Sequence, residues 1–273
     1  MGTSASHSGP KSGVSFDPPW LDDIDNPNAP ATPVTPTQEP LPAPATPPLA
    51  PPARFGSARR SMGDYIRSGS RDSLTKSLGH YSRTGMGGAR NVANRMRHSA
   101  SIASKLYSSF SSLREGNEPT ISSIISNYRA ANADLYGLID AIAEYICADG
   151  GSLDETSPRD SVSSALSDLF DKNPDVDITN LSDDGVWSLV SSFLGYEAFS
   201  RIQLDIGQAF ETNDIPLVDR VTRLNNMREY LESEISSQIS VIRNEMGNKP
   251  TSDLHKVMMT AIERTFKVFE VTV

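Results

Sequence analysis

Apolar residues recur at helical spacing through the C-terminal part of the chain. From about Ile121 onward they stand three or four residues apart, so that each run covers one face of a helix. No series of strand, turn and helix is evident, so the pattern predicts an all-α bundle over residues 118–273. The predicted faces are Leu135, Ile139, Ile142 and Ile146; Val162, Leu166, Leu169 and Phe170; Val186, Leu189, Val190, Phe193 and Leu194; Phe199, Ile202, Ile206 and Phe210; Leu217, Val221, Leu224, Leu231, Ile235, Ile239 and Ile242; and Leu254, Met258, Ile262 and Phe266.

Capping residues place several of these helix starts. Asp160 or Ser161 is expected to cap the second helix and Ser182 the third, because their side-chain oxygens accept hydrogen bonds from free backbone N–H groups. Pro216 suits the first position of the longest helix. Apolar and polar residues alternate in places over the closing residues 266–273. This end of the chain is therefore either a short strand or part of the last helix.

Residues 54–117 have a weaker apolar pattern and are predicted to form a basic helical hairpin. Ser70 or Asp72 caps a first helix, and Gly85 to Gly88 break the chain after it. The second helix has a narrow apolar seam with small residues in it, so the hairpin needs another surface to lie against. The apolar positions are Leu74, Leu78 and Tyr81 in the first helix and Val92, Met96, Ser99, Ala103, Leu106, Phe110 and Leu113 in the second.

Residues 1–53 are predicted to be a disordered, proline-rich arm. They hold 14 of the 19 prolines, which fix φ, lack a backbone donor and favour polyproline II. One island at residues 16–24 places Phe16 and Trp20 among acidic residues. It is either a short linear motif that becomes ordered on a partner or a segment that docks on the protein's own domain.

Charge is divided among the same three parts of the chain. Residues 1–53 carry a net charge of −4, residues 54–106 carry +9, and residues 107–273 carry −14. The basic part, with its interleaved Tyr65, Tyr81 and Tyr107, could contact phosphates and stack on bases. Docking on an acidic protein surface, including that of its own domain, is the favoured interpretation.

The residues that usually carry catalysis or bind metals do not form a recognisable site in the sequence. Four widely separated histidines lack metal-ligand spacing, no Gly-x-Ser-x-Gly motif is present, and Cys147 stands among apolar residues. The glycines before Arg90 are interpreted as a helix–helix hinge rather than a phosphate site. We therefore expect a protein that is not an enzyme and has no cofactor. Without an apolar run of ~18 residues or a signal peptide, it is expected in the cytoplasm.

The N-terminus offers one reactive group. Removal of Met1 would leave Gly2 with a free α-amine, whose pKa near 8 keeps roughly a tenth unprotonated at neutral pH. An unhindered glycine on a long arm is thus the best nitrogen nucleophile in the chain. Gly2 with Ser6 also fits the loose N-myristoylation pattern.

Three blocks of sequence resemble the QatB family, the small components of the bacterial Qat anti-phage defence system. They are Met1-Gly2-Thr3-Ser4 with Gly9-Pro10, Asp17-Pro18-Pro19-Trp20-Leu21, and the segment from Arg54 to Arg97, which includes Leu78-Gly79-His80-Tyr81 and Thr84-Gly85-Met86-Gly87-Gly88-Ala89-Arg90. The resemblance is concentrated in residues 1–115.

The resemblance implies an adaptor that binds QatC, a QueC-like protein, beside the Qat ATPase and a TatD-like nuclease. Enzymes like QueC join carboxy-deazaguanine to nitrogen with ATP, so it also implies that Gly2 is the acceptor, without myristoylation in a bacterial host. The adaptor would have no membrane partner and no small-molecule substrate of its own. In this hypothesis the partner contacts Thr3, Ser4, Phe16, Pro18, Pro19, Trp20, Leu21, Arg54, Phe55, Leu78, His80, Tyr81, Gly85, Gly87, Gly88 and Arg90.

Overall fold

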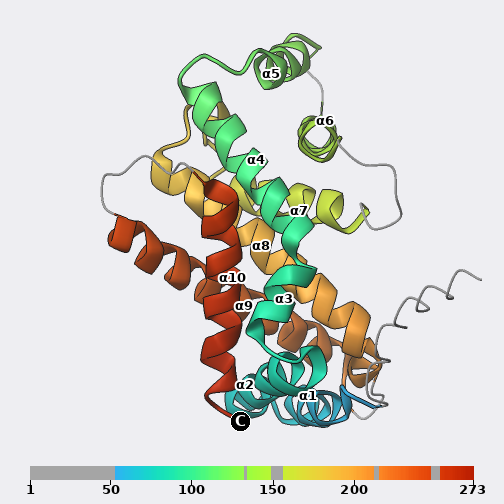
Figure 1. The fold of residues 1–273 in the computed structure, drawn as a ribbon. Coiled ribbons are helices and arrows are strands. Elements are labelled where there is room, and N and C mark those ends of the chain that lie inside the picture. Colours follow the sequence, from blue (N-terminus) through green and yellow to red (C-terminus); the bar gives the residue numbers. More distant parts are fainter. Residues whose placement is uncertain (1–52, 132–133, 149–155, 212–214, 247–252) are drawn as a thin grey trace, which may run out of the picture. The chain divides into compact units, whose positions relative to one another are not determined.

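The computed structural model describes residues 53–131, 134–148, 156–211, 215–246 and 253–273 (Figure 1). All the regular secondary structure in these residues is helical, which confirms the predicted all-α fold. The island at residues 16–24 and the arm up to residue 52 lie outside the described residues.

Ten α-helices occur in the described part of the chain, with one π-helical turn and two short 3₁₀ turns. They are α1 (Gly56–Ser68), α2 (Arg71–His80), the π-helical turn η1 (Tyr81–Met86), α3 (Ala89–Arg95), α4 (Arg97–Arg114), α5 (Pro119–Ala131), α6 (Leu135–Cys147), α7 (Thr156–Lys172), η3 (Ile178–Asn180), α8 (Asp183–Ile206), η4 (Gly207–Phe210), α9 (Leu217–Met246) and α10 (Leu254–Glu270).

The basic segment contains more helices than the predicted hairpin. Helix α1 escaped prediction because its buried stripe of Ala58, Met62, Tyr65 and Ile66 is narrow and lies among arginines. The predicted second helix is divided at Met96, whose φ of −92° and ψ of 15° interrupt the helix between α3 and α4. The seam prediction is nevertheless confirmed, since all seven of its positions are buried: Val92, Met96, Ser99, Ala103, Leu106, Phe110 and Leu113.

Helix α8 corrects a boundary that the sequence suggested. The third and fourth predicted helices are one continuous helix of 24 residues, with Ser182 as the predicted N-cap. Gly195 lies inside this helix, at the point where α8 comes close to α9. A Cβ at this position would be only 2.8 Å from the Cβ of Glu232. Helix α7 also begins at Thr156, a turn before the expected caps Asp160 and Ser161.

The end of the chain is helical up to Glu270 and then forms a turn. This resolves the alternative between strand and helix left open for residues 266–273. Phe266 and Phe269 are fully buried and pack edge to face, with ring centroids 5.7 Å apart. The aromatic side chains therefore follow a helical spacing of three residues.

Two helices form the centre of the described fold. Helix α8 packs against α4, α7 and α9, and α10 packs against α2, α3, α4 and α9 (Figure 1). Residues from the basic part and the acidic part enter the same hydrophobic cluster. The basic segment thus finds the surface that its narrow seam required, and the boundary after residue 117 stays a prediction.

Candidate functional site

The π-helical turn η1 gathers several of the residues that the sequence assigned to partner binding. The ring of Phe55 stacks on that of Tyr81, with centroids 5.5 Å apart. The Arg54 guanidinium also lies over the Phe55 ring, 4.7 Å from its centroid. Such π-helical turns are rare and occur frequently at functional sites.

Glycines give this turn its shape. A Cβ on Gly85 would lie 2.3 Å from the Cδ1 atom of Phe55, so only glycine lets the ring approach the backbone. Gly87 and Gly88 follow with φ of 75° and 118°, values that side-chain-bearing residues rarely adopt. The link between α2 and α3 predicted for these glycines is confirmed, and no phosphate-binding strand precedes it in the described residues.

Asp205, at the end of α8, fixes the turn to the acidic part of the chain. Tyr81 donates its hydroxyl hydrogen to Asp205 Oδ2 at 2.9 Å, and Arg95 forms an ion pair with Oδ1 at 2.8 Å. Arg59 donates to the Asp205 backbone oxygen at 3.1 Å. Burial and the neighbouring Asp205 carboxylate raise the pKa of Tyr81, so its hydroxyl stays a donor at all ordinary pH values.

The last turn of α10 closes over the same region. A Cβ on Gly79 would lie 2.5 Å from the Phe269 backbone oxygen, so the two helices touch at the glycine. Ser82 donates to Glu270 at 2.6 Å, and Arg83 donates to the Val273 backbone oxygen. The block from Arg54 to Arg97, quoted for the family resemblance, thus contributes to one well-packed corner of the described fold.

The structure divides the predicted partner-binding residues of this block into two groups. Phe55, Leu78, Tyr81 and Gly85 are buried and hold the corner together. Gly87 and Arg90 are exposed, while Arg54, His80 and Gly88 are partly exposed. The remaining predicted site residues lie outside the described residues: Gly2, Thr3, Ser4, Phe16, Pro18, Pro19, Trp20 and Leu21.

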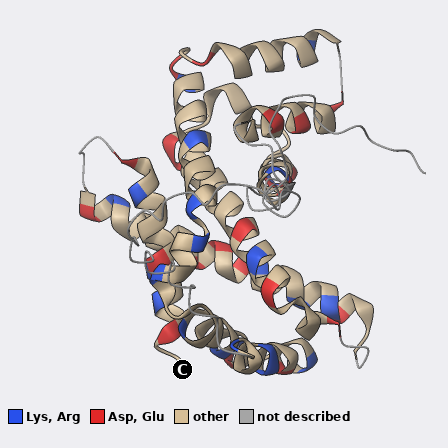
Figure 2. Ribbon diagram, turned by 45° about the vertical axis from the view of Figure 1, so that its right-hand side comes forward, with Lys and Arg blue, Asp and Glu red and all other residues tan. Residues whose placement is uncertain are grey.

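Three exposed arginines stand seven residues apart in the sequence of this segment, and we call Arg83, Arg90 and Arg97 the arginine stripe. They lie on η1, α3 and the first turn of α4. Of these three arginines, only Arg90 was among the predicted partner-binding residues, although their spacing of seven is visible in the sequence. Figure 2 shows Lys and Arg gathered on the lower helices of the view, where α1 and α2 lie.

The tyrosines of the basic segment are not placed to stack on bases. Tyr65 and Tyr81 are 3% and 1% exposed, and the Tyr65 hydroxyl donates to the Arg223 backbone oxygen. Tyr107 packs against the Trp187 ring, with centroids 4.4 Å apart. The expectation that these rings contact nucleobases is therefore wrong for the described conformation.

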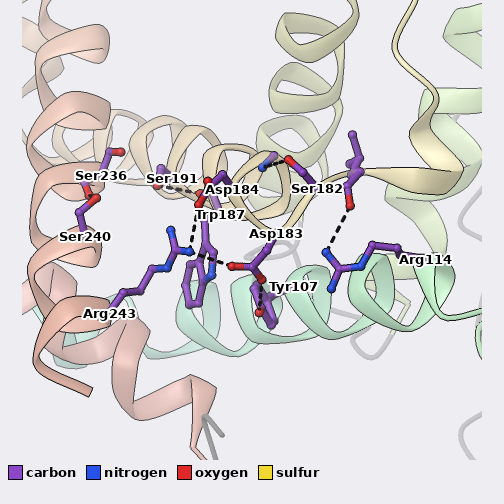
Figure 3. Close-up of polar contacts among 12 residues, drawn as sticks. Tyr107, Arg114, Ser182, Asp183, Asp184, Trp187, Ser191, Ser236, Ser240 and Arg243 are labelled. Carbon is purple, nitrogen blue, oxygen red and sulfur yellow. Dashed lines mark hydrogen bonds and ion pairs between the residues drawn. The ribbon is translucent and has the colours of Figure 1, made fainter. Parts of the chain in front are cut away.

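A second polar cluster joins α4, α8 and α9 (Figure 3). Arg243 forms ion pairs with Asp183 at 2.8 Å and Asp184 at 3.0 Å, and its guanidinium lies 5.3 Å from the Trp187 ring centroid. Tyr107 donates to Asp183 at 2.7 Å. The acidic pair in the first turn of α8 thus has an arginine partner and complements the helix dipole.

Two pockets of about 490 and 240 Å³ adjoin this cluster and share Ser188, Ser191 and Ser236. In the larger one, Arg228 forms ion pairs with Asp168 at 3.3 Å and Glu232 at 3.0 Å. Beside it, burial raises the pKa of Tyr196 to about 12, opposed by Arg228 and reinforced by Asp168. The two pockets are lined by serine hydroxyls and by charged side chains that are paired with one another, and not by a nucleophile with an adjacent base.

Glu197 is a buried polar centre that the sequence analysis missed. Its carboxylate accepts hydrogen bonds from Ser99 at 2.6 Å, Ser161 at 2.8 Å and Ser157 at 3.0 Å. These hydroxyls come from α4 and α7 and provide hydrogen bonds for an acidic side chain of α8 that is fully buried. The available signal was an acidic residue on the apolar face of the helix, four residues after Phe193 and next to Ala198.

Within the described residues, no group of three or more His, Cys, Asp or Glu side chains is arranged to bind a metal ion. None of the described helices combines the length and the apolar character that crossing a membrane requires.

Comparison with protein families matches residues 87–269 to the model described as Qat anti-phage system associated protein QatB. The matched range runs from the end of η1 into the last turn of α10, and it covers the greater part of the chain. No curated protein and no solved structure matches the chain.

Proposed function

Because the chain belongs to the QatB family and so is a component of the Qat anti-phage system, we propose that it serves this system as a non-enzymatic adaptor and substrate. Its partner would be the QueC-like protein QatC, which would use the N-terminal arm as acceptor. The Qat ATPase and the TatD-like nuclease are further candidate partners, and the cytoplasm is the proposed location.

The adaptor role is supported mainly by one observation: in the block from Arg54 to Arg97, some residues are buried and others are exposed. Its buried members, Phe55, Tyr81 and Gly85, hold η1 against α1 and α8, while Gly87 and Arg90 stay exposed. A rigid, exposed basic corner suits binding to another macromolecule, because little conformational freedom remains to be lost on association.

The substrate role rests on the chemistry of the Gly2 amine. In the proposed reaction, ATP activates the carboxylate of carboxy-deazaguanine as an acyl adenylate and pyrophosphate leaves. The unprotonated amine attacks the acyl carbon, an amide C–N bond forms, AMP leaves, and the nitrogen gives up one proton. The low pKa of an α-amine, compared with that of lysine, makes Gly2 the favoured acceptor.

Intact-mass measurement after co-expression with the neighbouring genes tests this step. We expect the wild-type chain to lose Met1 and gain the mass of the acyl group on Gly2. Gly2→Ala keeps an α-amine and should be modified in part, whereas Gly2→Glu should retain Met1 and remain unmodified. A wild-type chain that shows methionine loss alone, in cells still protected from phage, would rule out the modification.

The motif at residues 16–24 is proposed to contribute to partner binding. Trp20→Ala should reduce the amount of QueC-like protein that co-purifies with the chain, since the arm would lose its largest apolar side chain. Asn28→Ala, in the same arm but outside the motif, is the matched control. Unchanged co-purification of Trp20→Ala would count against a role for the motif.

Nucleic-acid binding by residues 54–97 is the second candidate function. The net charge of +9 in residues 54–106 and the exposed arginine stripe favour it. It predicts a salt-sensitive gel shift with a DNA or RNA duplex, and no shift with the isolated protein at low salt would remove it.

A further inference from the structure

We infer that the arginine stripe is a docking surface for a carboxylate-bearing protein surface. The inference rests on the proposed adaptor function and names the partner chemistry of its basic corner. It concerns Arg83, Arg90 and Arg97, which are exposed on η1, α3 and α4.

None of these three arginines forms an ion pair with a side-chain carboxylate of the described residues. Arg83 reaches the Val273 backbone oxygen, and Arg97 makes a long hydrogen bond of 3.4 Å to Asn94 Oδ1. Each guanidinium still has N–H groups available, because it carries five donors in a fork that matches a carboxylate.

The missing carboxylates do not reflect a shortage of acids in the chain. It has 34 acidic residues against 25 basic ones, and several arginines elsewhere are paired with acids. Arg228 and Arg243 each contact two or more carboxylates. The stripe therefore presents three exposed guanidinium groups without a side-chain carboxylate partner among the described residues, on a chain that is acidic overall.

The stripe is held in place by the packing beneath it. Gly85 fits against the Phe55 ring, and Asn91 donates from Nδ2 to the Met86 and Gly87 backbone oxygens at 3.0 and 3.1 Å. These contacts fix the path of the chain from η1 into α3. Arginines on a fixed backbone lose less freedom on binding than arginines on a loose one.

Two observations favour protein carboxylates over nucleic-acid phosphates. The nearby rings that could stack on bases, Tyr65 and Tyr81, are buried. Residues 107–273 carry −14, so a long polyanion that extended from the basic corner over the acidic part would be repelled there. A protein with a locally acidic patch is attracted at short range without presenting a long row of negative charges.

Charge reversal of the full-length chain tests the inference. Arg83→Glu, Arg90→Glu and Arg97→Glu together should weaken binding to the co-expressed QueC-like protein by about tenfold or more, and this loss should shrink in high salt. The control variant reverses Arg129, Lys256 and Lys267, which are also exposed, so its net charge changes equally. It should bind within about twofold of wild type.

Equal losses in the two triple variants, or no loss in the stripe variant, would overturn the inference. So would a stripe-dependent gel shift with duplex DNA or RNA combined with unchanged protein binding. Circular dichroism checks that both variants stay folded. If the stripe proves necessary for partner binding while Gly2 of the wild type remains unmodified, the inference stands and the proposed substrate role fails.

Discussion

Arginine is used differently in the basic part of the chain, residues 54–106, and in the acidic part, residues 107–273. In the acidic part, Arg159, Arg228 and Arg243 each contact at least two carboxylates. In the basic part, Arg95 pairs with Asp205 across the two parts, while the arginine stripe has no side-chain carboxylate partner among the described residues.

The contrast shows what joins two oppositely charged segments in this fold. Few ion pairs join the two parts: among the described residues, Arg95 with Asp205 is the pair that the structure shows. Apolar seams and directed hydrogen bonds make the connection instead, as between Tyr81 and Asp205 or between Ser99 and Glu197. Exposed ion pairs are individually weak, whereas buried apolar contacts dominate stability.

Replacing Phe55 with alanine should have the largest effect. The ring is 8% exposed and stacks on Tyr81, so its loss leaves a cavity under η1. We expect about 3 kcal/mol of destabilisation in urea unfolding and weaker partner binding, because the stripe loses its support.

Tyr136→Ala is the matched control for this aromatic truncation. Tyr136 is 73% exposed, so its removal should change the free energy of unfolding by less than about 0.5 kcal/mol. If Phe55→Ala is as stable as wild type but fails to bind the partner, Phe55 is a contact residue rather than a support.

A methyl group at Gly195 should disturb the acidic part with an intermediate effect. The new Cβ would meet the Cβ of Glu232 at 2.8 Å and its Cα at 3.0 Å, so α8 and α9 must separate. We expect Gly195→Ala to cost about 1–3 kcal/mol in thermal or urea unfolding.

Gly56→Ala serves as the reference for Gly195, because a Cβ at Gly56 meets no atom within 4 Å. It lies in the first turn of α1 and should be neutral or slightly stabilising. Equal unfolding free energies for the two alanine variants would show that α8 and α9 can separate without cost.

Arg243→Ala and Arg90→Ala compare the two uses of arginine directly and should have the smallest effects on stability. Arg243→Ala loses two ion pairs and the contact with Trp187, which should cost about 1 kcal/mol in urea unfolding. Arg90→Ala should change stability by less than about 0.5 kcal/mol but reduce partner binding. If Arg90→Ala lowered stability and Arg243→Ala reduced partner binding instead, the two arginines would not differ in the way proposed.

Most positions of the helical seams could be predicted from the sequence because helical spacing places apolar side chains on one face. Leu135, Leu217 and Val221 fit the spacing but are exposed, since no other helix of the described residues covers them. The 4-3 pattern from Val92 to Leu113 predicted its buried positions, although it did not show the interruption at Met96. Ser182 was identified as an N-cap because capping is a local interaction.

Other features depend on neighbours that are distant in sequence. Phe55 and Tyr81 were predicted to bind a partner because the family resemblance implies it, while their burial depends on Gly85 and on Asp205, 124 residues beyond Tyr81. The faces from Val186 to Leu194 and from Phe199 to Phe210 were predicted as two helices, while the fit of Gly195 against Glu232 depends on another helix, α9. The sequence thus indicated residues that gather around η1, but it could not distinguish the exposed ones from the buried ones.

The serine-lined site of Glu197 has a consequence for the order in which the chain folds. Its three donors stand 98, 40 and 36 residues away, on helices on either side of residue 117. Burying the carboxylate before all three arrive would leave a charge without its donors, at a cost of several kcal/mol. Helices α4, α7 and α8 should therefore close in one cooperative step, with amide hydrogens that exchange together.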